Sequence, residues 1–433
     1  MKFGTDGVRG EAGVAPIDDD GARRAGAAAA AWSRASRGGV VFVARDTRPS
    51  GASLAAAALA GAASAGARAV DAGVLPSAGL SAAVAATPGA TGVMVTASHN
   101  PVSDNGFKVL GPGGAKPDDA WTARLEAWLA TPPVADGGVV VDGKAEAGEA
   151  YTRAWMKAAG DLSPLRGRRI AIDLANGAAS EWSALWSRAL KGVDVRWLGA
   201  GDGVINDGCG SEHPESLAAA VRAEACDAGL AVDGDADRAL LVDHTGAVVH
   251  GDRLTWLLTQ GLGVRGLAVT VMSTLALEST LPGVRVVRTP VGDRHLSIAM
   301  REHGLDLGAE ESGHVLFLHG LPGGDGMLTG LRALAAAFAA ADSLQDAIAP
   351  FVPWPRKLTK VRAAVRVPFE SVPEIVEAIA VGEVALGQGR VFVRWSGTEP
   401  VLRVLVEAPE VDRVVHVSER VTEVCRRALG GEP

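Results

Sequence analysis

The sequence predicts an α/β protein in which three similar α/β domains are followed by a smaller C-terminal α+β domain. Short runs rich in valine and isoleucine alternate with longer alanine-rich segments, and such alternation is typical of strands and helices in parallel α/β sheets. The pattern of the first stretch returns near residue 170 and again near residue 267, which indicates three similar units. The expected strands are Val40–Ala44, Gly92–Thr96, Arg169–Asp173, Gly229–Asp233 and Leu267–Met272.

Segments rich in glycine, proline and aspartate divide the chain at residues 131–143, 243–251 and 349–355. After the last of them the pattern changes to three strands and a helix, expected at Val361–Val367, Arg390–Arg394, Leu402–Glu407 and Val411–Leu429. We therefore expect four domains, at residues 1–143, 144–246, 247–355 and 356–433.

Composition and charge exclude several classes of partner. The 433 residues carry a net charge of −8, and an acidic surface repels a phosphate backbone, which argues against nucleic acid. The three cysteines form no CxxC pair, which argues against disulfides or structural zinc and fits a reducing compartment. Without an N-terminal apolar run or a stretch of about 20 apolar residues, we expect a cytoplasmic protein with no membrane partner. Whether it is a monomer or a homodimer stays open.

The segment from Asp233 to Arg238, DGDADR, follows an expected strand. Its carboxylates at Asp233, Asp235 and Asp237 repel one another unless a cation lies among them. An EF-hand loop also begins DxDxD, but it needs glycine and glutamate where this chain has Arg238 and His244. We expect a Mg²⁺ site with room for a phosphate oxygen; an acidic surface turn is the alternative.

The segment Thr96–Pro101, TASHNP, also follows an expected strand, and ligands gather at strand ends in open α/β sheets. Ser98 can act there as a nucleophile or phosphate carrier, with His99 and Lys108 as candidates for proton transfer and charge stabilisation. No GxSxG elbow supports a hydrolase triad. A simple turn or helix cap is the alternative.

Three further segments suggest contacts with a ligand. Arg394–Pro400, RWSGTEP, could cradle a phosphate dianion or form a hairpin turn. Glu310–His314, EESGH, could bond the hydroxyls of a sugar or cap a helix. Phe3–Gly10, FGTDGVRG, could bring backbone close to a ligand or form a flexible N-terminus.

These five motifs, in this order, resemble the α-D-phosphohexomutase family over the whole chain. Supporting stretches are RDTRPSG at Arg45–Gly51, TASHNPVSDNGFK at Thr96–Lys108, DLANGA at Asp173–Ala178 and GCGSEHPESL at Gly208–Leu217. The resemblance implies a heart-shaped, four-domain enzyme with a central active-site cleft that one motif from each domain faces. It also implies an intramolecular phosphotransferase that uses a phosphoserine and a hexose 1,6-bisphosphate intermediate.

The resemblance further implies roles for individual residues. Ser98 would carry the phosphate, and one oxygen of that phosphate would join Asp233, Asp235 and Asp237 in binding Mg²⁺. Residues implied near the transferring group are Arg9, His99, Lys108 and Arg238. Residues implied to hold the sugar hydroxyls are Glu310 and Ser312. Residues implied to bind the phosphate that is not transferred are Arg394, Ser396, Gly397, Thr398 and Arg403.

The sugar is suggested by finer likenesses. Thr289–Arg294, TPVGDR, and Val271–Ser273 before it resemble the branch of the family that acts on glucosamine phosphate. Asp293, Arg294 and His314 are therefore expected to contact substrate, and Gly313–His314 argues against the glucose-specific branch. A hexosamine phosphate would feed amino-sugar nucleotide and cell-wall precursor synthesis. Glucose or mannose phosphate, a non-catalytic sugar-phosphate binding protein and an aspartyl phosphatase are the alternatives.

Four residues depart from the family pattern: glutamine is replaced by Glu311, glycine by Ala309, tyrosine by His295 and a glycine of the metal loop by Ala236. Because alanine tolerates positive φ poorly, we expect a negative φ at Ala236.

Overall fold

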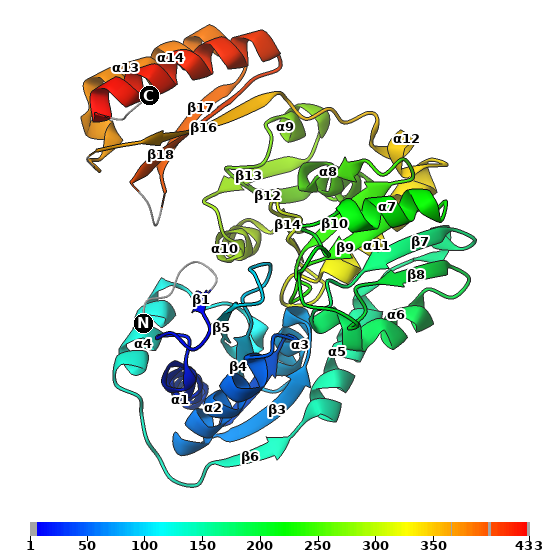
Figure 1. Cartoon of the computed structure of the whole chain (residues 1–433), viewed down its shortest axis with the longest axis vertical. Helices are drawn as coiled ribbons and strands as arrows, with labels where there is room; N and C mark the ends of the chain where they lie inside the picture. Colours follow the sequence, from blue (N-terminus) through cyan, green and yellow to red (C-terminus); the bar gives the residue numbers. More distant parts are fainter. Residues whose placement is uncertain (1–6, 365, 397–399, 431–433) are drawn as a thin grey trace. The chain divides into compact units, whose positions relative to one another are not determined.

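The computed structural model describes residues 7–364, 366–396 and 400–430, which form two compact units (Figure 1). Unit 1 comprises Met1–Ser273 and Gly283–Pro350 and contains three α/β sheets, whereas unit 2 comprises Thr274–Pro282 and Phe351–Pro433 and contains a fourth. The predicted fold class is confirmed. The four domain boundaries stay predictions: strand β11 pairs with β10 beyond the boundary expected at residue 246.

The first sheet has six strands in the order β1-β5-β4-β2-β3-β6. Its strands are β1 (Val8–Glu11), β2 (Val40–Arg45), β3 (Arg68–Val74), β4 (Thr91–Val95), β5 (Asp104–Leu110) and β6 (Val139–Asp142). Its helices are α1 (Asp19–Ala35), α2 (Gly51–Ser64), α3 (Ser77–Ala86), α4 (Asp119–Ala130) and α5 (Lys144–Ala158). Alanine fills the facing sides of α1 and α2, so these helices pack closely: a Cβ at Gly26 would lie 1.9 Å from the main-chain oxygen of Ala58.

The second and third sheets have five and four strands, in the orders β11-β10-β9-β7-β8 and β13-β12-β14-β15. The second contains β7 (Arg169–Asp173), β8 (Asp194–Leu198), β9 (Ala228–Val232), β10 (Ala239–Asp243) and β11 (Val248–Val249), with α6 (Ser183–Ala189) and α7 (Glu215–Ala223). The third contains β12 (Gly266–Thr270), β13 (Arg285–Thr289), β14 (Leu307–Ala309) and β15 (Val315–Phe317), with α8 (Gly251–Gly261), α10 (Asp293–His303), α11 (Gly326–Ala340) and α12 (Leu344–Ile348).

One four-strand arrangement recurs in all three sheets, as β5-β4-β2-β3, β10-β9-β7-β8 and β15-β14-β12-β13. In each, three parallel strands end in a short connection to an antiparallel strand. The strands that the sequence predicted in these sheets are parallel, whereas the antiparallel strands β5, β10 and β15 were not predicted. The connections after β4, β9 and β14 are too short for a helical crossover, which a parallel pair needs.

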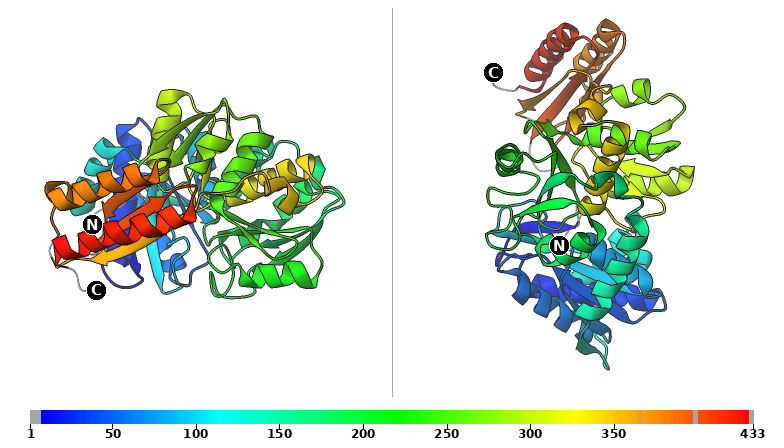
Figure 2. Two further views of the ribbon diagram at one scale, coloured as in Figure 1. Left: turned by 90° about the horizontal axis from the view of Figure 1, so that it is seen from above. Right: turned by 90° about the vertical axis from the view of Figure 1, so that its right-hand side faces the viewer.

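Unit 2 is a three-stranded antiparallel sheet with two long helices side by side on one face (Figures 1 and 2). The elements are β16 (Arg356–Arg362), β17 (Arg390–Trp395), β18 (Val401–Glu407), α13 (Pro373–Leu386), α14 (Val411–Leu429) and the short α9 (Ala276–Thr280). Valines such as Val404 and Val417 fill the core between sheet and helices. The expected strand at Val361–Val367 is misplaced, since β16 begins at Arg356 and ends at Arg362.

One buried carboxylate, that of Glu407, holds the segment Thr274–Pro282 in unit 2. Glu407 is fully buried, and it accepts hydrogen bonds from Thr274 Oγ1 (2.5 Å) and the Leu275 N–H (3.0 Å). Its other oxygen pairs with the Arg390 guanidinium (2.7 Å). A buried charge must be paired and hydrogen-bonded, so α9 stays attached to this unit although the flanking chain belongs to unit 1.

None of the helices in the described ranges has both the length and the apolar character needed to cross a bilayer.

Candidate active site

Three of the predicted motifs lie in the three equivalent connections of unit 1. The Ser98 loop joins β4 to β5, the aspartate loop joins β9 to β10, and the EESGH segment joins β14 to β15. The carboxyl ends of parallel strands lie at one edge of a sheet. The repeated strand order therefore presents each motif at the corresponding edge of its own sheet.

Ser98 lies at the centre of these contacts. Its side chain is buried, and its Oγ donates to Asp233 Oδ2 (2.5 Å) and lies 3.3 Å from His99 Nδ1. Ser98 has a φ of 54°, in the left-handed region that is unfavourable for a residue with a Cβ. Strain of this kind persists only where the surroundings enforce it, and the loop shows what enforces it.

The guanidinium of Arg48 holds the Ser98 loop by donating hydrogen bonds to main-chain oxygens of the loop. The guanidinium is buried, and its Nε pairs with Asp46 Oδ2 at 3.0 Å. Burial raises the pKa of Asp46 to about 6, against the opposing charge of Arg48. The loop oxygens that accept from Arg48 are those of Ser98 (2.9 Å), Asn100 (2.7 Å), Asp104 (2.8 Å) and Pro101.

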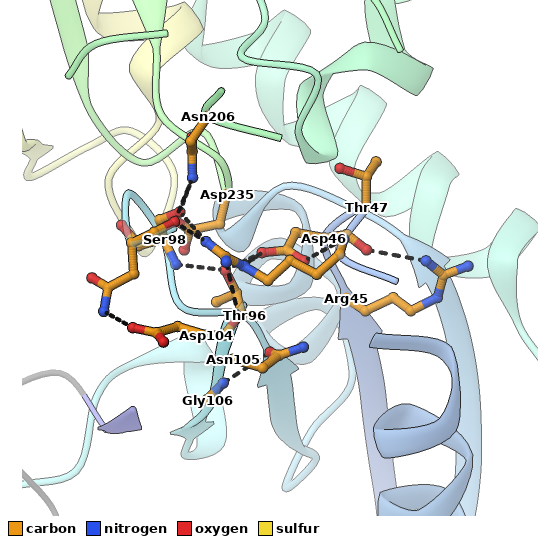
Figure 3. A network of polar contacts seen from close by, with 12 residues as sticks. Arg45, Asp46, Thr47, Thr96, Ser98, Asp104, Asn105, Gly106, Asn206 and Asp235 are labelled. Atoms are coloured by element: carbon orange, nitrogen blue, oxygen red, sulfur yellow. Dashed lines mark hydrogen bonds and ion pairs between the residues drawn. The ribbon is translucent and has the colours of Figure 1, made fainter. Parts of the chain in front are cut away.

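Two further side chains complete this support (Figure 3). Thr96 donates from its Oγ1 to Asp46 Oδ2 (2.6 Å) and accepts from the Ser98 N–H (2.8 Å). Asn206, from the second sheet's part of the chain, donates to the main-chain oxygen of Ser98 at 2.8 Å. The backbone of the serine is thus held by residues from the parts of the chain that form two sheets.

The three aspartates converge as the sequence predicted. Asp233, Asp235 and Asp237 are all buried, and one oxygen from each lies within 4.8 Å of the others. In the part of the chain that the structure describes, Asp235 Oδ1 is buried without a hydrogen-bond partner. A buried carboxylate oxygen without a donor is costly. The cluster therefore fits a hard cation with oxygen ligands.

The surroundings of the cluster shift the pKa values of Asp233 and Asp237 in opposite directions. Burial, followed by the charges of Asp237 and Asp235, raises the pKa of Asp233 to about 7. Burial would also raise the pKa of Asp237, but Lys108 and His314 outweigh it and hold that pKa well below its usual range. Lys108 Nζ lies 2.7 Å from Asp235 Oδ2 and 3.0 Å from Asp237 Oδ2. The site thus keeps negative charge for a cation while protein cations already offset part of it.

The expectation of a negative φ at Ala236 is wrong, because the structure has φ 60° there. The main-chain N–H groups of Asp237 and Arg238 both donate to Asp233 Oδ1, at 3.0 and 3.1 Å. Wrapping the chain around this one oxygen forces Ala236 into the left-handed region. Such a conformation costs about 1–3 kcal/mol for a residue with a Cβ, which the two charge-assisted bonds offset.

Beside the cluster lies a cavity of about 380 Å³. Its lining includes five predicted residues from all three sheets of unit 1: Arg9, Arg238, Asp293, Glu310 and His314. Burial and the charge of Asp293 raise the pKa of Glu310, against the opposing charge of His314. Burial would lower the pKa of His314, but the carboxylates of Asp237 and Asp293 raise it to about 10. The cavity thus brings carboxyl groups and cationic side chains together, which suits a polar ligand.

Other predicted residues lie elsewhere. Ser312 is exposed and does not line this cavity. Arg294 pairs with Asp119 (2.5 Å) and lines a smaller neighbouring cavity instead. In unit 2, Arg394 lies opposite Arg403 on β17 and β18.

The remaining predictions concern the RWSGTEP loop of unit 2. Ser396 is buried, and its N–H donates to the Val401 oxygen (2.8 Å). Gly397 and Thr398 lie outside the described residues.

Four site residues were not singled out from the sequence: Arg48, Asn206, Ser77 and Lys116. Ser77 donates to Asp235 Oδ2 (2.5 Å), and Lys116 lies 2.6 Å from Asp293 Oδ2. Arg48 belongs to the quoted RDTRPSG stretch, so a signal for it was present. The other three lie in segments whose residue types are ordinary for loops and helix starts.

Comparison with known proteins identifies the family of the chain. The phosphoglucomutase/phosphomannomutase models match in three parts: alpha/beta/alpha domain I at residues 1–132, alpha/beta/alpha domain III at 243–353 and the C-terminal domain at 355–424. The chain belongs to this family, the α-D-phosphohexomutases. A relative from Frankia casuarinae named phosphoglucosamine mutase is 40% identical to it, over 99% of this chain and 98% of the relative.

Solved structures share the fold. A phosphoglucomutase/phosphomannomutase family protein from Burkholderia thailandensis superposes with a TM-score of 0.78 at 24% identity, over 98% of this chain and 97% of that one. The N-acetylphosphoglucosamine mutase of Aspergillus fumigatus, solved in complex with GlcNAc-6P and magnesium, gives a TM-score of 0.67 at 19% identity, over 99% and 95% of the two chains.

The support of the Ser98 loop is testable with Arg48→Lys. Lysine keeps the charge but cannot reach four main-chain oxygens and a carboxylate with one ammonium group. We expect the free energy of unfolding in urea to fall by about 2 kcal/mol. Hydrogen exchange of the amides at residues 98–104 should also speed up. Arg45→Lys is the control, because Arg45 is only half-buried and donates to the main-chain oxygen of Asp46. Equal stability and equal exchange in both variants would contradict the role of Arg48.

Proposed function

We propose that the protein interconverts glucosamine 6-phosphate and glucosamine 1-phosphate, with Ser98 as the phosphoryl carrier. The observation that carries the proposal is the buried contact of Ser98 Oγ with Asp233, 2.5 Å long, inside a cluster that fits a cation. Relatives at about 40% identity over nearly the whole chain carry the name phosphoglucosamine mutase, which supports the choice of reaction and sugar.

Asp233, Asp235 and Asp237 would hold Mg²⁺, together with an oxygen of the phosphate on Ser98. The ion would supply Lewis-acid stabilisation of charge on the transferring phosphoryl group. Phosphoryl transfer depends mainly on positioning and charge stabilisation, and a phosphoserine carries about −1.5 to −2 charges near neutral pH. Lys108, Arg9 and Arg238 are the protein cations proposed to offset that charge.

In the forward half-reaction the bond between phosphorus and Ser98 Oγ breaks while a sugar hydroxyl oxygen bonds to the phosphorus. The proton of that hydroxyl must go to a base, and His99 is proposed for this role. Burial, followed by the positive charge of Arg238, lowers the pKa of His99. Its imidazole is therefore neutral at neutral pH and able to accept a proton. The resulting 1,6-bisphosphate would then turn over and return its other phosphate to Ser98.

The cavity beside the metal loop is proposed to hold the sugar. Glu310, Asp293 and His314 line it and can accept from or donate to hydroxyl and amino groups. Acidic side chains also favour an amino sugar, which is cationic near neutral pH. Arg294 and Ser312 remain proposed contacts of the same substrate.

The tail domain is proposed to bind the phosphate that is not transferred. Arg394 and Arg403 are cross-strand neighbours in β17 and β18, so their charges lie on the same face of the sheet. Ser396, Gly397, Thr398 and these arginines would grip the phosphate, and a grip remote from the chemistry can release one end of the bisphosphate and bind the other.

The sugar preference is tested by assaying glucosamine, glucose and mannose phosphates at equal concentrations in coupled assays. We expect kcat/KM for glucosamine phosphate to exceed the other two by about tenfold or more, because a site built for a polar group discriminates strongly when that group is missing. A preference for glucose or mannose phosphate would move the protein to another branch of the family. Binding without turnover of any of the three would contradict the enzyme.

The carrier role is tested with Ser98→Ala. Alanine keeps the backbone but cannot form the phosphoester, so we expect turnover to fall by more than about 10³-fold. Circular dichroism should remain that of the wild type. Ser53→Ala, at an exposed serine of α2, is the matched control and should keep full activity. Near-normal turnover in Ser98→Ala, or phosphate found on an aspartate instead, would overturn the mechanism.

The metal role is tested with Asp235→Asn. The amide keeps the shape but loses the charge and one anionic ligand, so the Mg²⁺ concentration for half-maximal activity should rise about tenfold or more. The increase in Tm that Mg²⁺ causes in the wild type should shrink in parallel. The exposed Asp207→Asn serves as the charge-matched control. An unchanged Mg²⁺ response of both activity and Tm would remove Asp235 from the metal site.

A further inference from the structure

The loop between β15 and α11 contains two adjacent glycines, Gly323 and Gly324. Hydrogen bonds of the next residue, Asp325, fix the end of this loop. The next residue, Asp325, is buried and begins α11 by accepting from the Leu328 N–H at 2.7 Å. Asp325 also accepts from the hydroxyl of Tyr151 at 2.7 Å. A loop held by a helix cap and a buried hydrogen bond cannot shift easily.

Gly324 lies flat against the imidazole of His314. A Cβ at this position would fall 2.4 Å from Cε1, 2.7 Å from Nε2 and 2.9 Å from Nδ1 of that ring. The φ of Gly324 lies outside the left-handed region, so the backbone itself would accept an alanine. The three atoms nearest to such a Cβ all belong to this ring, so the ring is the first obstacle that a side chain would meet.

Gly323 provides a contrast within the same loop. A Cβ at Gly323 would meet Ser81 at 3.4 Å, which is ordinary van der Waals distance, and its φ is also outside the left-handed region. Alanine is therefore tolerable at Gly323 and intolerable at Gly324, unless the ring of His314 moves.

The ring of His314 lies between two carboxylates. Its Nδ1 is 3.5 Å from Asp237 Oδ1 and its Nε2 is 3.3 Å from Asp293 Oδ2. The ring also lines both the cavity of about 380 Å³ and a smaller one of about 50 Å³, whereas Gly324 lines only the smaller. Gly324 thus supports the ring from the side away from the proposed sugar cavity.

We propose that Gly324 is a positioning residue: the missing side chain lets the His314 ring lie between the metal loop and the sugar loop, in contact with both Asp237 and Asp293. The proposal rests on the proposed function, in which these two aspartates serve the metal and the sugar. An alanine at 324 pushes the ring toward the larger cavity and breaks at least one of its two contacts. Displacements of this order, about 1 Å, can cost about 10²-fold in rate.

Gly324→Ala and Gly323→Ala are compared as purified full-length proteins. We expect Gly324→Ala to lower kcat by about 10- to 100-fold and Gly323→Ala to change it by less than about twofold. In ¹H–¹⁵N spectra of the histidine side chains, the His314 signals, assigned by their loss in His314→Ala, should shift in Gly324→Ala and stay in place in Gly323→Ala. Unshifted signals with normal kcat in Gly324→Ala would overturn the proposal.

A double-mutant cycle separates this positioning role from a general loss of stability. In the His314→Ala background the ring is gone, so adding Gly324→Ala should lower the urea midpoint and kcat by much less than it does in the wild type. If Gly324→Ala costs the same in both backgrounds, the ring is not what the glycine accommodates, and the proposal fails.

Failure of the proposed function gives a different result. A wild-type protein without turnover on any hexose phosphate would sink the mutase assignment. The spectral shift and the urea cycle would still report whether Gly324 positions His314.

Discussion

Burying three carboxylates in one small volume is the constraint on which the rest of unit 1 depends. One oxygen each of Asp233, Asp235 and Asp237 lies within 4.8 Å of the others, and all three residues are buried. Their mutual repulsion is strong at low dielectric, so cations must come from other parts of the chain. Lys108 comes from β5 of the first sheet and His314 from the turn before β15 of the third. The aspartate loop of the second sheet is therefore a point at which all three sheets must meet.

The same constraint explains why the Ser98 loop carries so much support. A serine that donates to Asp233 must keep a fixed position relative to a loop that lies more than a hundred residues away in the sequence. All three nitrogens of the Arg48 guanidinium donate, either to main-chain oxygens of that loop or to Asp46. None of these acceptors is a group proposed to react. Positive φ at Ser98 and at Ala236 is stabilised by these bonds and by those around Asp233. Strain at both positions is consistent with a pre-organised site.

The repeated strand order gives a structural reason for the spacing of the motifs. Each sheet of unit 1 follows its third parallel strand with an antiparallel one, and the connection between them carries a motif. A hairpin-like connection keeps the polar side chains at the sheet edge, close to both strands, whereas a helical crossover would lead the chain away. The strands expected from the sequence included none of these antiparallel ones, because the pairing of a short strand across a connection is a tertiary contact that a hydrophobic run does not specify.

What the sequence by itself determined was the set of local elements and the chemistry of the motifs. Arg169–Asp173 and Val411–Leu429 were predicted with their observed ends, since periodicity and flanking turns are local properties. The DGDADR carboxylates imply a cation from their spacing alone. Tertiary structure decided the rest. It brought Lys108, Asn206 and Lys116 to the site, turned Ala236 to positive φ, and placed Gly324 against His314. These are contacts between residues far apart in the chain, and they depend on how sheets pack, which no local pattern encodes.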